Sequence, residues 1–251
     1  MIVGISNIII SALIAIGVFN IGHRLGGNMI NEYPENTIEC LQLFLGRYSD
    51  DPHFSYLELD VQETKDSNLV IFHDNTIERI IPLDKFGNDT LLAKYINTKK
   101  ESYNMIDFSK NELMNFKLDE RNTHISNLEQ ILSFLDSINF NKEILVEIKL
   151  LKTDKSKQHL IDIIDKYNNN LKIKLMADVY HYQYSFTNPE VWCSEFKDRN
   201  VDLVTVGFHN GRCDKKLTSN FLSQKPLDRN LIILSSAILL SGSVLLNENE
   251  W

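Results

Sequence analysis

The stretch YLELDVQETKDSNLVIFHD, residues 56–74, decides the fold prediction for this chain. Alternate side chains of an extended strand point to opposite faces, so Glu58 and Asp60 share one face and the apolar residues between them take the other. Two neighbouring carboxylates on an apolar strand repel each other and are costly to desolvate. A divalent cation between them would remove both penalties, and carboxylate oxygens favour Mg²⁺ or Ca²⁺ over zinc. The alternative for this pair is a strand end at which both acids meet solvent.

Short apolar runs of this kind recur along the chain. Candidate strands lie at residues 18–22, 56–61, 69–72, 144–148, 173–179, 201–208 and 231–234. Near-continuous Val, Ile and Leu is typical of strands that are buried on both faces, as in a parallel sheet. Helical periodicity lies between them, at residues 35–45, 127–138 and 159–167, with Ser126 as a candidate N-cap of the second helix.

This alternation predicts an α/β fold, and a chain of 251 residues suits a TIM-like (β/α) barrel, which typically takes roughly 250. The long, polar segment 75–121 breaks the rhythm and is predicted to be an insertion after the third strand. Gly and Pro number only 10 and 5, and no tract rich in Gly, Ser or Pro indicates a linker. We therefore expect a single domain that spans residues 1–251.

The N-terminal segment leaves the compartment open. Residues 2–19 carry no charge, and about 20 apolar residues can span a bilayer. The segment is therefore either a membrane anchor or export signal, or a buried helix that leads into the first strand. The absence of Lys and Arg from its start is atypical of a signal peptide. The N-terminal segment is therefore compatible with a cytoplasmic protein and with a membrane-associated or exported one. A second uncharged run, residues 231–246, is predicted to lie in the hydrophobic core.

The net charge of −8 disfavours nucleic acid and anionic lipid surfaces as partners, because neither is attracted to an acidic protein at long range. Cys40, Cys193 and Cys213 are widely spaced and include no CxxC pair. They indicate neither a zinc knuckle nor a disulfide framework, and we expect reduced structural thiols. Nothing in the sequence indicates the oligomeric state.

Other chemistry-bearing side chains fall at the ends of predicted strands, where barrel enzymes carry their active sites. His23 and Arg24 follow the first apolar run, and His73 ends the third. Glu147 and Lys149 repeat the two-apart spacing at the end of the fourth. Taken singly, each has a structural alternative, such as a core histidine, a surface arginine or an ion pair. Their joint placement predicts that a barrel brings three acids, two histidines and two cations together.

On these residues the chain resembles the glycerophosphodiester phosphodiesterase family. The matching segments are HRLGG…YPENT within 23–37, ELDVQETKD…VIFHD within 58–74 with NTIER after it, and HISNLEQIL…ILVEIK within 124–149. The resemblance implies a TIM barrel with an insertion after the third strand. It also implies metal-dependent hydrolysis of glycerophosphodiesters, small molecules of lipid and glycerol metabolism, to glycerol 3-phosphate and an alcohol.

The resemblance implies three ligands for one divalent cation, Mg²⁺ or Ca²⁺, and a histidine pair that acts as general base and general acid. It also implies two residues that bind the phosphate of the substrate and a third that orients the groups of this substrate-binding site. The metal ligands would be Glu58, Asp60 and Glu147. His23 would be the general base and His73 the general acid. Arg24 and Lys149 would bind the phosphate, and Glu35 would orient the groups of the site. A cation flanked by two basic side chains would form a cationic pocket for an anionic phosphodiester within an acidic protein.

Two features depart from the family. Leu25 intervenes in HRLGG, where the family usually reads HRG. Beyond Lys149 the chain lacks the tryptophan-containing penultimate strand and the Gly-Asp ending, which predicts a shortened or irregular C-terminal part. Two alternatives therefore stand beside the enzyme. The atypical C-terminal half favours a barrel that keeps the pocket for binding, and the apolar N-terminus favours a phospholipase-type phosphodiesterase acting on membrane lipids.

Overall fold

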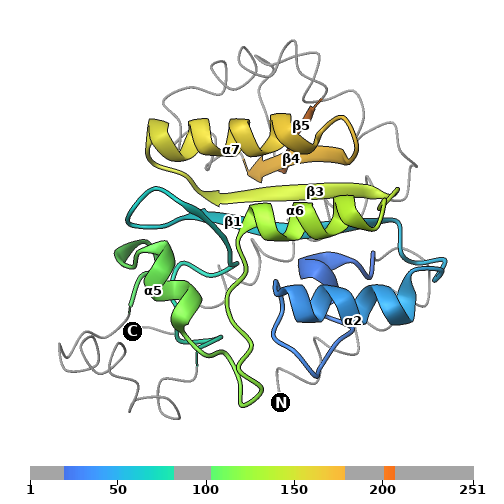
Figure 1. Ribbon diagram of the computed structural model, residues 1–251, viewed down its shortest axis with the longest axis horizontal. Helices are drawn as coiled ribbons and strands as arrows, with labels where there is room; N and C mark the ends of the chain where they lie inside the picture. Colours follow the sequence, from blue (N-terminus) through green and yellow to red (C-terminus); the bar gives the residue numbers. More distant parts are fainter. Residues whose placement is uncertain (1–19, 82–102, 179–200, 207–251) are drawn as a thin grey trace, which may run out of the picture.

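The computed structural model describes residues 20–81, 103–178 and 201–206 of the chain (Figure 1). Its centre is a five-stranded sheet with the strand order β2-β1-β3-β4-β5. The strands are β1 (Tyr56–Glu63), β2 (Leu69–Ile71), β3 (Glu143–Leu150), β4 (Lys172–Asp178) and β5 (Asp202–Val206). β1, β3, β4 and β5 run parallel, whereas β2 returns antiparallel to β1.

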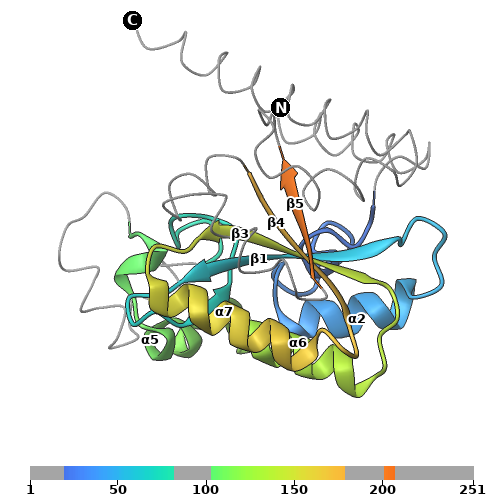
Figure 2. The same cartoon turned by 90° about the horizontal axis from the view of Figure 1, so that it is seen from above.

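Helices cover one face of this sheet. Two views at right angles show three of them together on that side (Figures 1 and 2), namely α2 (Ile38–Tyr48), α6 (Leu128–Ser137) and α7 (Asp154–Tyr167). α7 connects the parallel neighbours β3 and β4, which is the βαβ unit of α/β folds. The shorter elements are η1 (His23–Gly26), η2 (Met105–Asp107) and α5 (Lys110–Asn115).

Alternation along the strands separates apolar from charged side chains. Leu57 and Leu59 of β1 and Val146 of β3 are fully buried in the main hydrophobic core, with Leu132 of α6 and Ile164 of α7. Removal of this apolar surface from water is the main force that holds helices and sheet together. The opposite face of β1 and β3 carries the charged residues of the candidate site.

The predicted third strand, residues 69–72, does not join the parallel series. β2 pairs antiparallel with β1, so that Val61 lies opposite Ile71. The link between the strands is too short for a parallel crossover, which needs a dozen or more residues. Ser67, with a left-handed φ of 61°, lies in the turn that reverses the chain. The prediction of a further parallel strand here was therefore wrong, and residues 56–71 form a hairpin.

The predicted first strand is not a strand where the structure describes it. Residues 21 and 22 form a turn, and residues 18 and 19 lie outside the described residues. The segment nevertheless lies beside β1, because Glu58 N donates a hydrogen bond to Gly22 O at 2.9 Å. It therefore delivers the following residues, 23–26, to the charged face of β1.

Two helices begin later than predicted because of their caps. Asn36 adopts a left-handed φ of 61°, so α2 begins only after the N-cap Thr37. α6 is capped by Asn127 and not by Ser126, whose hydroxyl accepts a hydrogen bond from Ile38 N at 2.9 Å. Ser126 thus serves the N-terminus of α2, a contact between segments far apart in the sequence.

The described parts of the insertion, 75–81 and 103–121, pack around a second hydrophobic cluster. Val70 and Phe72 of the hairpin belong to it, as do Phe108 and Phe116, whose rings meet edge to face at 5.3 Å. These described parts of the insertion therefore pack on the hairpin. Residues 82–102 lie outside the described residues, and the division of the chain into domains stays a prediction.

Several predictions for the ends of the chain fall outside the described residues. They concern the uncharged runs 2–19 and 231–246, the strand at 231–234, Cys193 and Cys213. Cys40 is fully buried, and burial raises the pKa of its thiol to about 12, so it stays protonated near neutral pH. Within the described part of the chain, no helix has both the length and the hydropathy that a bilayer crossing requires.

A buried carboxylate fixes α7 to the sheet. Glu63, at the end of β1, is 2% exposed. Its Oε2 accepts hydrogen bonds from Lys152 N, from Thr153 N at 3.0 Å and from the Ser156 hydroxyl at 2.8 Å. A carboxylate at this end also interacts favourably with the helix dipole. α7 accordingly begins at Asp154, earlier than predicted.

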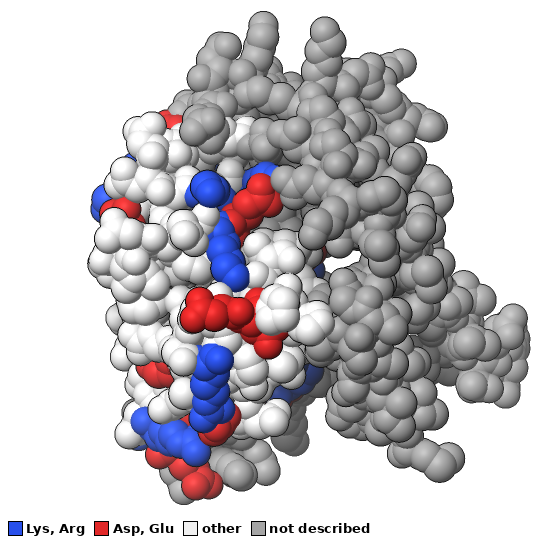
Figure 3. Space-filling model, turned by 90° about the vertical axis from the view of Figure 1, so that its right-hand side faces the viewer, with Lys and Arg blue, Asp and Glu red and all other residues white. Residues whose placement is uncertain are grey.

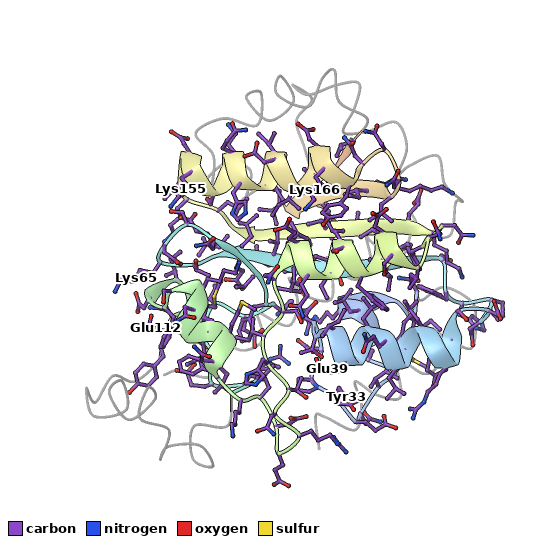
Figure 4. All side chains as sticks on the ribbon, in the orientation of Figure 1. Tyr33, Glu39, Lys65, Glu112, Lys155 and Lys166 are labelled. Atoms are coloured by element: carbon purple, nitrogen blue, oxygen red, sulfur yellow. The ribbon has the colours of Figure 1, made fainter. Side chains whose placement is uncertain are left out.

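We expect Glu63→Gln to lower the free energy of unfolding by about 2 kcal/mol, because a neutral amide accepts weaker hydrogen bonds from the same buried donors. Urea denaturation measures this loss. The matched control is Glu129→Gln in α6, whose carboxylate pairs at 2.6 Å with the exposed Lys166 of α7. Lys166 is labelled in Figure 4. Its loss should be much smaller, since exposed ion pairs stabilise little. Equal losses in both variants would contradict this account of Glu63.

Candidate active site

Three carboxylates converge on the face of the sheet opposite the helices. Glu58 and Asp60 come from β1 and Glu147 from β3, and the parallel register sets Asp60 directly opposite Glu147. One oxygen of each lies within 4.8 Å of the other two. The structure therefore brings the three predicted acids together, although they lie within their strands and not at the strand ends.

These carboxylates are buried with few hydrogen-bond donors. Glu58 and Asp60 are 3% and 0% exposed, and within the described residues no hydrogen bond reaches Glu58 Oε1 or Asp60 Oδ1. Burial and the repulsion of Asp60 and Glu147 raise the pKa of Glu58 well above its ordinary value. Burial also raises the pKa of Glu147. A buried cluster whose candidate metal ligands are all carboxylate oxygens fits a hard divalent cation.

Lys149 lies in the same cluster. Its Nζ forms an ion pair with Glu147 Oε1 and lies 3.3 Å from Asp60 Oδ1. Burial alone would lower the pKa of Lys149, but these two carboxylates raise it, so the ammonium stays charged. Arg24 adds a second cation, with Nε 3.8 Å from Asp60 Oδ2. Three carboxylates thus share two cationic side chains, which leaves negative charge for a metal ion to offset.

The segment HRLGG turns sharply to present Arg24 to the acids. Arg24 and Leu25 have left-handed φ values of 50° and 57°, which are uncommon outside glycine. Arg24 N donates to Glu58 Oε2 at 2.7 Å, while Leu25 is fully buried in the core. Gly26 has a φ of 85°, and a Cβ there would lie 2.2 Å from the Phe44 ring. The extra leucine is therefore accommodated as a core residue.

His23 lies at the edge of the acid cluster. Its Nε2 is 3.7 Å from Glu58 Oε2, and the Asn28 amide nitrogen is 3.0 Å from its Nδ1. The side chain keeps 37% of its surface exposed. Burial by the surrounding protein and the charge of Arg24 nevertheless lower the pKa of His23 to about 4. The imidazole is therefore neutral near pH 7.

The sequence predicted that His73 lies at the end of a parallel strand. In the structure His73 instead follows β2, the antiparallel strand of the hairpin. Phe72 N donates to Asp60 O at 2.9 Å. The buried Gln62 amide donates to the carbonyl groups on either side of His73, at 2.9 Å to Phe72 O and 2.7 Å to Asp74 O. His73 Nδ1 lies 2.6 Å from Asp74 Oδ1. Strand β1 thus fixes both the acids and the backbone that carries this histidine.

The residues before α2 connect the two sides of the site. Glu35, predicted to be helical, lies ahead of α2 and accepts hydrogen bonds from Arg24 Nη1 at 3.0 and 3.2 Å and from Arg79 Nη2 at 2.6 Å. Partial burial alone would raise the pKa of Glu35, but Arg79 and Arg24 hold it below its ordinary value. Asn36 donates to Asp60 Oδ2 at 2.7 Å.

Four residues of this network were missed by the sequence-based prediction of the site. They are Asn36, Gln62, Asp74 and Arg79. All four fall inside the segments PENT, DVQ, FHD and NTIER, so the motifs contained them. Their partners lie far away in the sequence, and only the fold shows which groups they contact.

A sequence model described as the glycerophosphoryl diester phosphodiesterase family matches residues 28–205, more than half of the chain. The chain belongs to this family. The match covers β1 to β4 and all three predicted metal ligands, and it begins just after His23 and Arg24.

Relatives within and near the family include a curated glycerophosphodiester phosphodiesterase from Haemophilus influenzae, 31% identical over 87 residues. That alignment covers 35% of this chain and 21% of the relative, so the chain matches about a fifth of that protein's length. The aligned segment agrees with the family match, and most of the relative lies outside the alignment.

Solved structures share the fold. A putative glycerophosphodiester phosphodiesterase from Galdieria sulphuraria aligns with a TM-score of 0.53 at 22% identity, covering 76% of this chain and 65% of that one. An Oleispira antarctica phosphodiesterase, in complex with the product sn-glycerol-3-phosphate, aligns with a TM-score of 0.50 at 14% identity, covering 73% and 64%. The predicted fold class, a TIM-like (β/α) barrel, is confirmed.

Calorimetric titration of the chelator-treated protein with Mg²⁺ or Ca²⁺ should detect one ion bound with release of protons. Because the pKa of Glu58 is raised, the cation competes with a proton, and its affinity should fall as the pH is lowered through that pKa. The same raised pKa means that the metal-free protein loses stability as the pH rises above the ordinary glutamate range. A bound cation should reverse this loss.

Glu58→Gln should weaken the binding of the ion and reduce proton release to the part that Glu147 contributes, whereas the surface variant Glu129→Gln should bind as the wild type does. Equal affinities in the two variants, or binding that is independent of pH, would argue against a site at these carboxylates.

Proposed function

We propose that this chain hydrolyses glycerophosphodiesters to glycerol 3-phosphate and an alcohol, using one divalent cation. The observation that carries the proposal is the cluster of Glu58, Asp60 and Glu147, buried within 4.8 Å of one another beside two histidines. A buried acidic cluster is unfavourable without a cation, and family membership gives this cluster a phosphodiester as its reactant.

The cation would be Mg²⁺ or Ca²⁺, held by oxygens of the three carboxylates. When bound, it supplies positive charge that offsets the carboxylates and withdraws electron density from the phosphoryl group. Lys149 keeps its own charge in the cluster and would contact a phosphate oxygen. Arg24, which is held by Glu35, would bind another with its planar guanidinium.

Local cations of this kind are needed because the protein is acidic overall. Its net charge is −8, and the face in Figure 3 carries acidic and basic side chains next to one another. A phosphodiester is therefore attracted by the cluster itself and not by the general field of the protein. This favours a small anionic substrate over an extended polyanion such as nucleic acid.

Two histidines would move the protons. His23, neutral because its pKa is lowered to about 4, would take a proton from the attacking hydroxyl group. His73 would give a proton to the departing alcohol from Nε2, since its Nδ1 is hydrogen-bonded to Asp74. Each histidine must be restored after one turnover by proton exchange with solvent, and both side chains are partly exposed.

Two alternatives would use the same residues differently. A binding module would hold a phosphodiester without cleaving it, and a phospholipase-type enzyme would cleave intact membrane lipids. The structural neighbour from Oleispira antarctica, which binds sn-glycerol-3-phosphate, favours a small product of the glycerophosphodiester class. The apolar segment that suggested a membrane substrate lies outside the described residues, so nothing in the fold adds to that alternative.

The decisive assay measures glycerol 3-phosphate released from glycerophosphocholine and glycerophosphoethanolamine, in parallel with hydrolysis of phospholipid vesicles. We expect turnover of the free diesters that is lost on chelation and restored by Mg²⁺ or Ca²⁺. Glu147→Gln and His73→Ala should each lower kcat by about 100-fold or more while the folded state is retained. Glu129→Gln is the control and should keep full activity.

Full turnover in chelator, or in Glu147→Gln, would overturn the metal-dependent proposal. Binding of diesters without turnover would identify the binding module, and hydrolysis confined to vesicles would identify the phospholipase-type enzyme.

A further inference from the structure

We propose that Arg79 is a positioning residue that holds the general acid and the phosphate-binding arginine in one geometry. The inference rests on the proposed function and adds a part to it. Arg79 lies near the start of the insertion, and its hydrogen bonds run to residues other than the three metal-binding candidates. It acts through two carboxylates, Asp74 and Glu35.

A continuous chain of contacts carries the inference. Arg79 Nε pairs with Asp74 Oδ2, and Asp74 Oδ1 lies 2.6 Å from His73 Nδ1. On the other side, Arg79 Nη2 lies 2.6 Å from Glu35 Oε1. Glu35 in turn accepts two hydrogen bonds from Arg24 Nη1. One guanidinium thus links His73 to Arg24 through two carboxylates that would otherwise move independently.

The Asp74 arm sets the orientation of the His73 ring. Partial burial alone would raise the pKa of Asp74, but hydrogen bonds from Arg79 and His73 hold it below its ordinary value. Asp74 therefore stays ionised and accepts a hydrogen bond from the Nδ1–H of His73, which leaves Nε2 to exchange a proton with the substrate. Gln62 holds the peptide groups on both sides of the histidine, so the backbone is fixed independently of the ring.

The Glu35 arm limits the freedom of Arg24. Glu35 is the partner that orients the Arg24 guanidinium, because the contact of Arg24 Nε with Asp60 is longer, at 3.8 Å. With Arg79 present, Glu35 is fixed from two sides. Without it, Glu35 could follow Arg24 towards solvent, and the guanidinium would lose its fixed direction towards the acid cluster.

The local structure anchors the backbone of Arg79 while leaving its side chain near the surface. Ile77 and Ile81 on either side are buried, at 1% and 0% exposure, and Ile81 N donates to Ile77 O at 2.9 Å. The Arg79 side chain itself is 46% exposed. Ion pairs at such exposure stabilise a fold little, so the expected role of Arg79 is orientation of its neighbours.

The test compares Arg79→Gln and Arg79→Lys with the control Arg47→Gln. Arg47 is similarly exposed, at 45%, and forms a single pair with Glu32 at 2.8 Å. Arg79→Gln should lower kcat by about 10- to 100-fold, because misplaced reacting groups lose rate on that scale. Arg79→Lys should recover only part of it, since an ammonium cannot bridge two carboxylates as a guanidinium fork does. Arg47→Gln should retain the wild-type kcat.

A double-mutant cycle separates this role from a general loss of structure. Asp74→Asn should lower kcat on its own, and adding Arg79→Gln should cost clearly less than it costs in the wild type, because both changes break the same link. Independent, fully multiplicative losses would show that Arg79 does not act through Asp74.

Nitrogen NMR of the His73 ring provides a readout that needs no turnover. The wild type and Arg47→Gln should keep a proton on Nδ1, hydrogen-bonded to Asp74, in both the neutral and the doubly protonated ring. Arg79→Gln should show a neutral ring that divides between the two tautomers. A wild-type kcat together with an unchanged His73 spectrum in Arg79→Gln would overturn the inference. Should the wild type hydrolyse no diester, the proposed function fails, whereas the His73 spectra still decide whether Arg79 positions the histidine.

Discussion

Three carboxylates held inside the protein repel one another, and this repulsion determines which groups must surround them. Glu58, Asp60 and Glu147 share one face of two adjacent strands, and burial raises the pKa of both Glu58 and Glu147. Such an arrangement is tolerable only when positive charge lies within a few ångströms. Lys149 and Arg24 supply part of it, and among the described residues no hydrogen bond reaches Glu58 Oε1, which marks where more is needed.

The fold produces this cluster by simple means. Alternation along β1 sends leucine and valine side chains to the helix-covered core and sends the acids to the opposite face. The parallel register of β1 and β3 then places Asp60 opposite Glu147. The hairpin of β1 and β2 brings His73 back to the same place, while the turn at Arg24 is pressed against Glu58. A few local rules therefore assemble a site from segments more than a hundred residues apart.

Periodicity and motif chemistry predicted β1, β3, β4 and the convergence of the acids, because both depend on side chains that are close in sequence or share a strand face. These sequence patterns gave wrong or incomplete predictions where contacts between distant segments determine the structure. His73 was assigned to a parallel strand end, since an apolar run does not reveal the direction of its neighbour. Glu35 was predicted to be helical, but the left-handed backbone of Asn36 prevents α2 from extending back to it. The motif NTIER contains Arg79 but did not reveal its contacts, because its two partners lie 5 and 44 residues away.

The most direct measurement is anomalous diffraction from crystals of the protein equilibrated with Mn²⁺, which binds oxygen ligands as Mg²⁺ does. A shared metal site predicts one strong peak, about 2.0–2.6 Å from an oxygen of each of Glu58, Asp60 and Glu147. A peak elsewhere, or none at saturating Mn²⁺ with the Lys149 ammonium filling the centre of the cluster, would contradict the account.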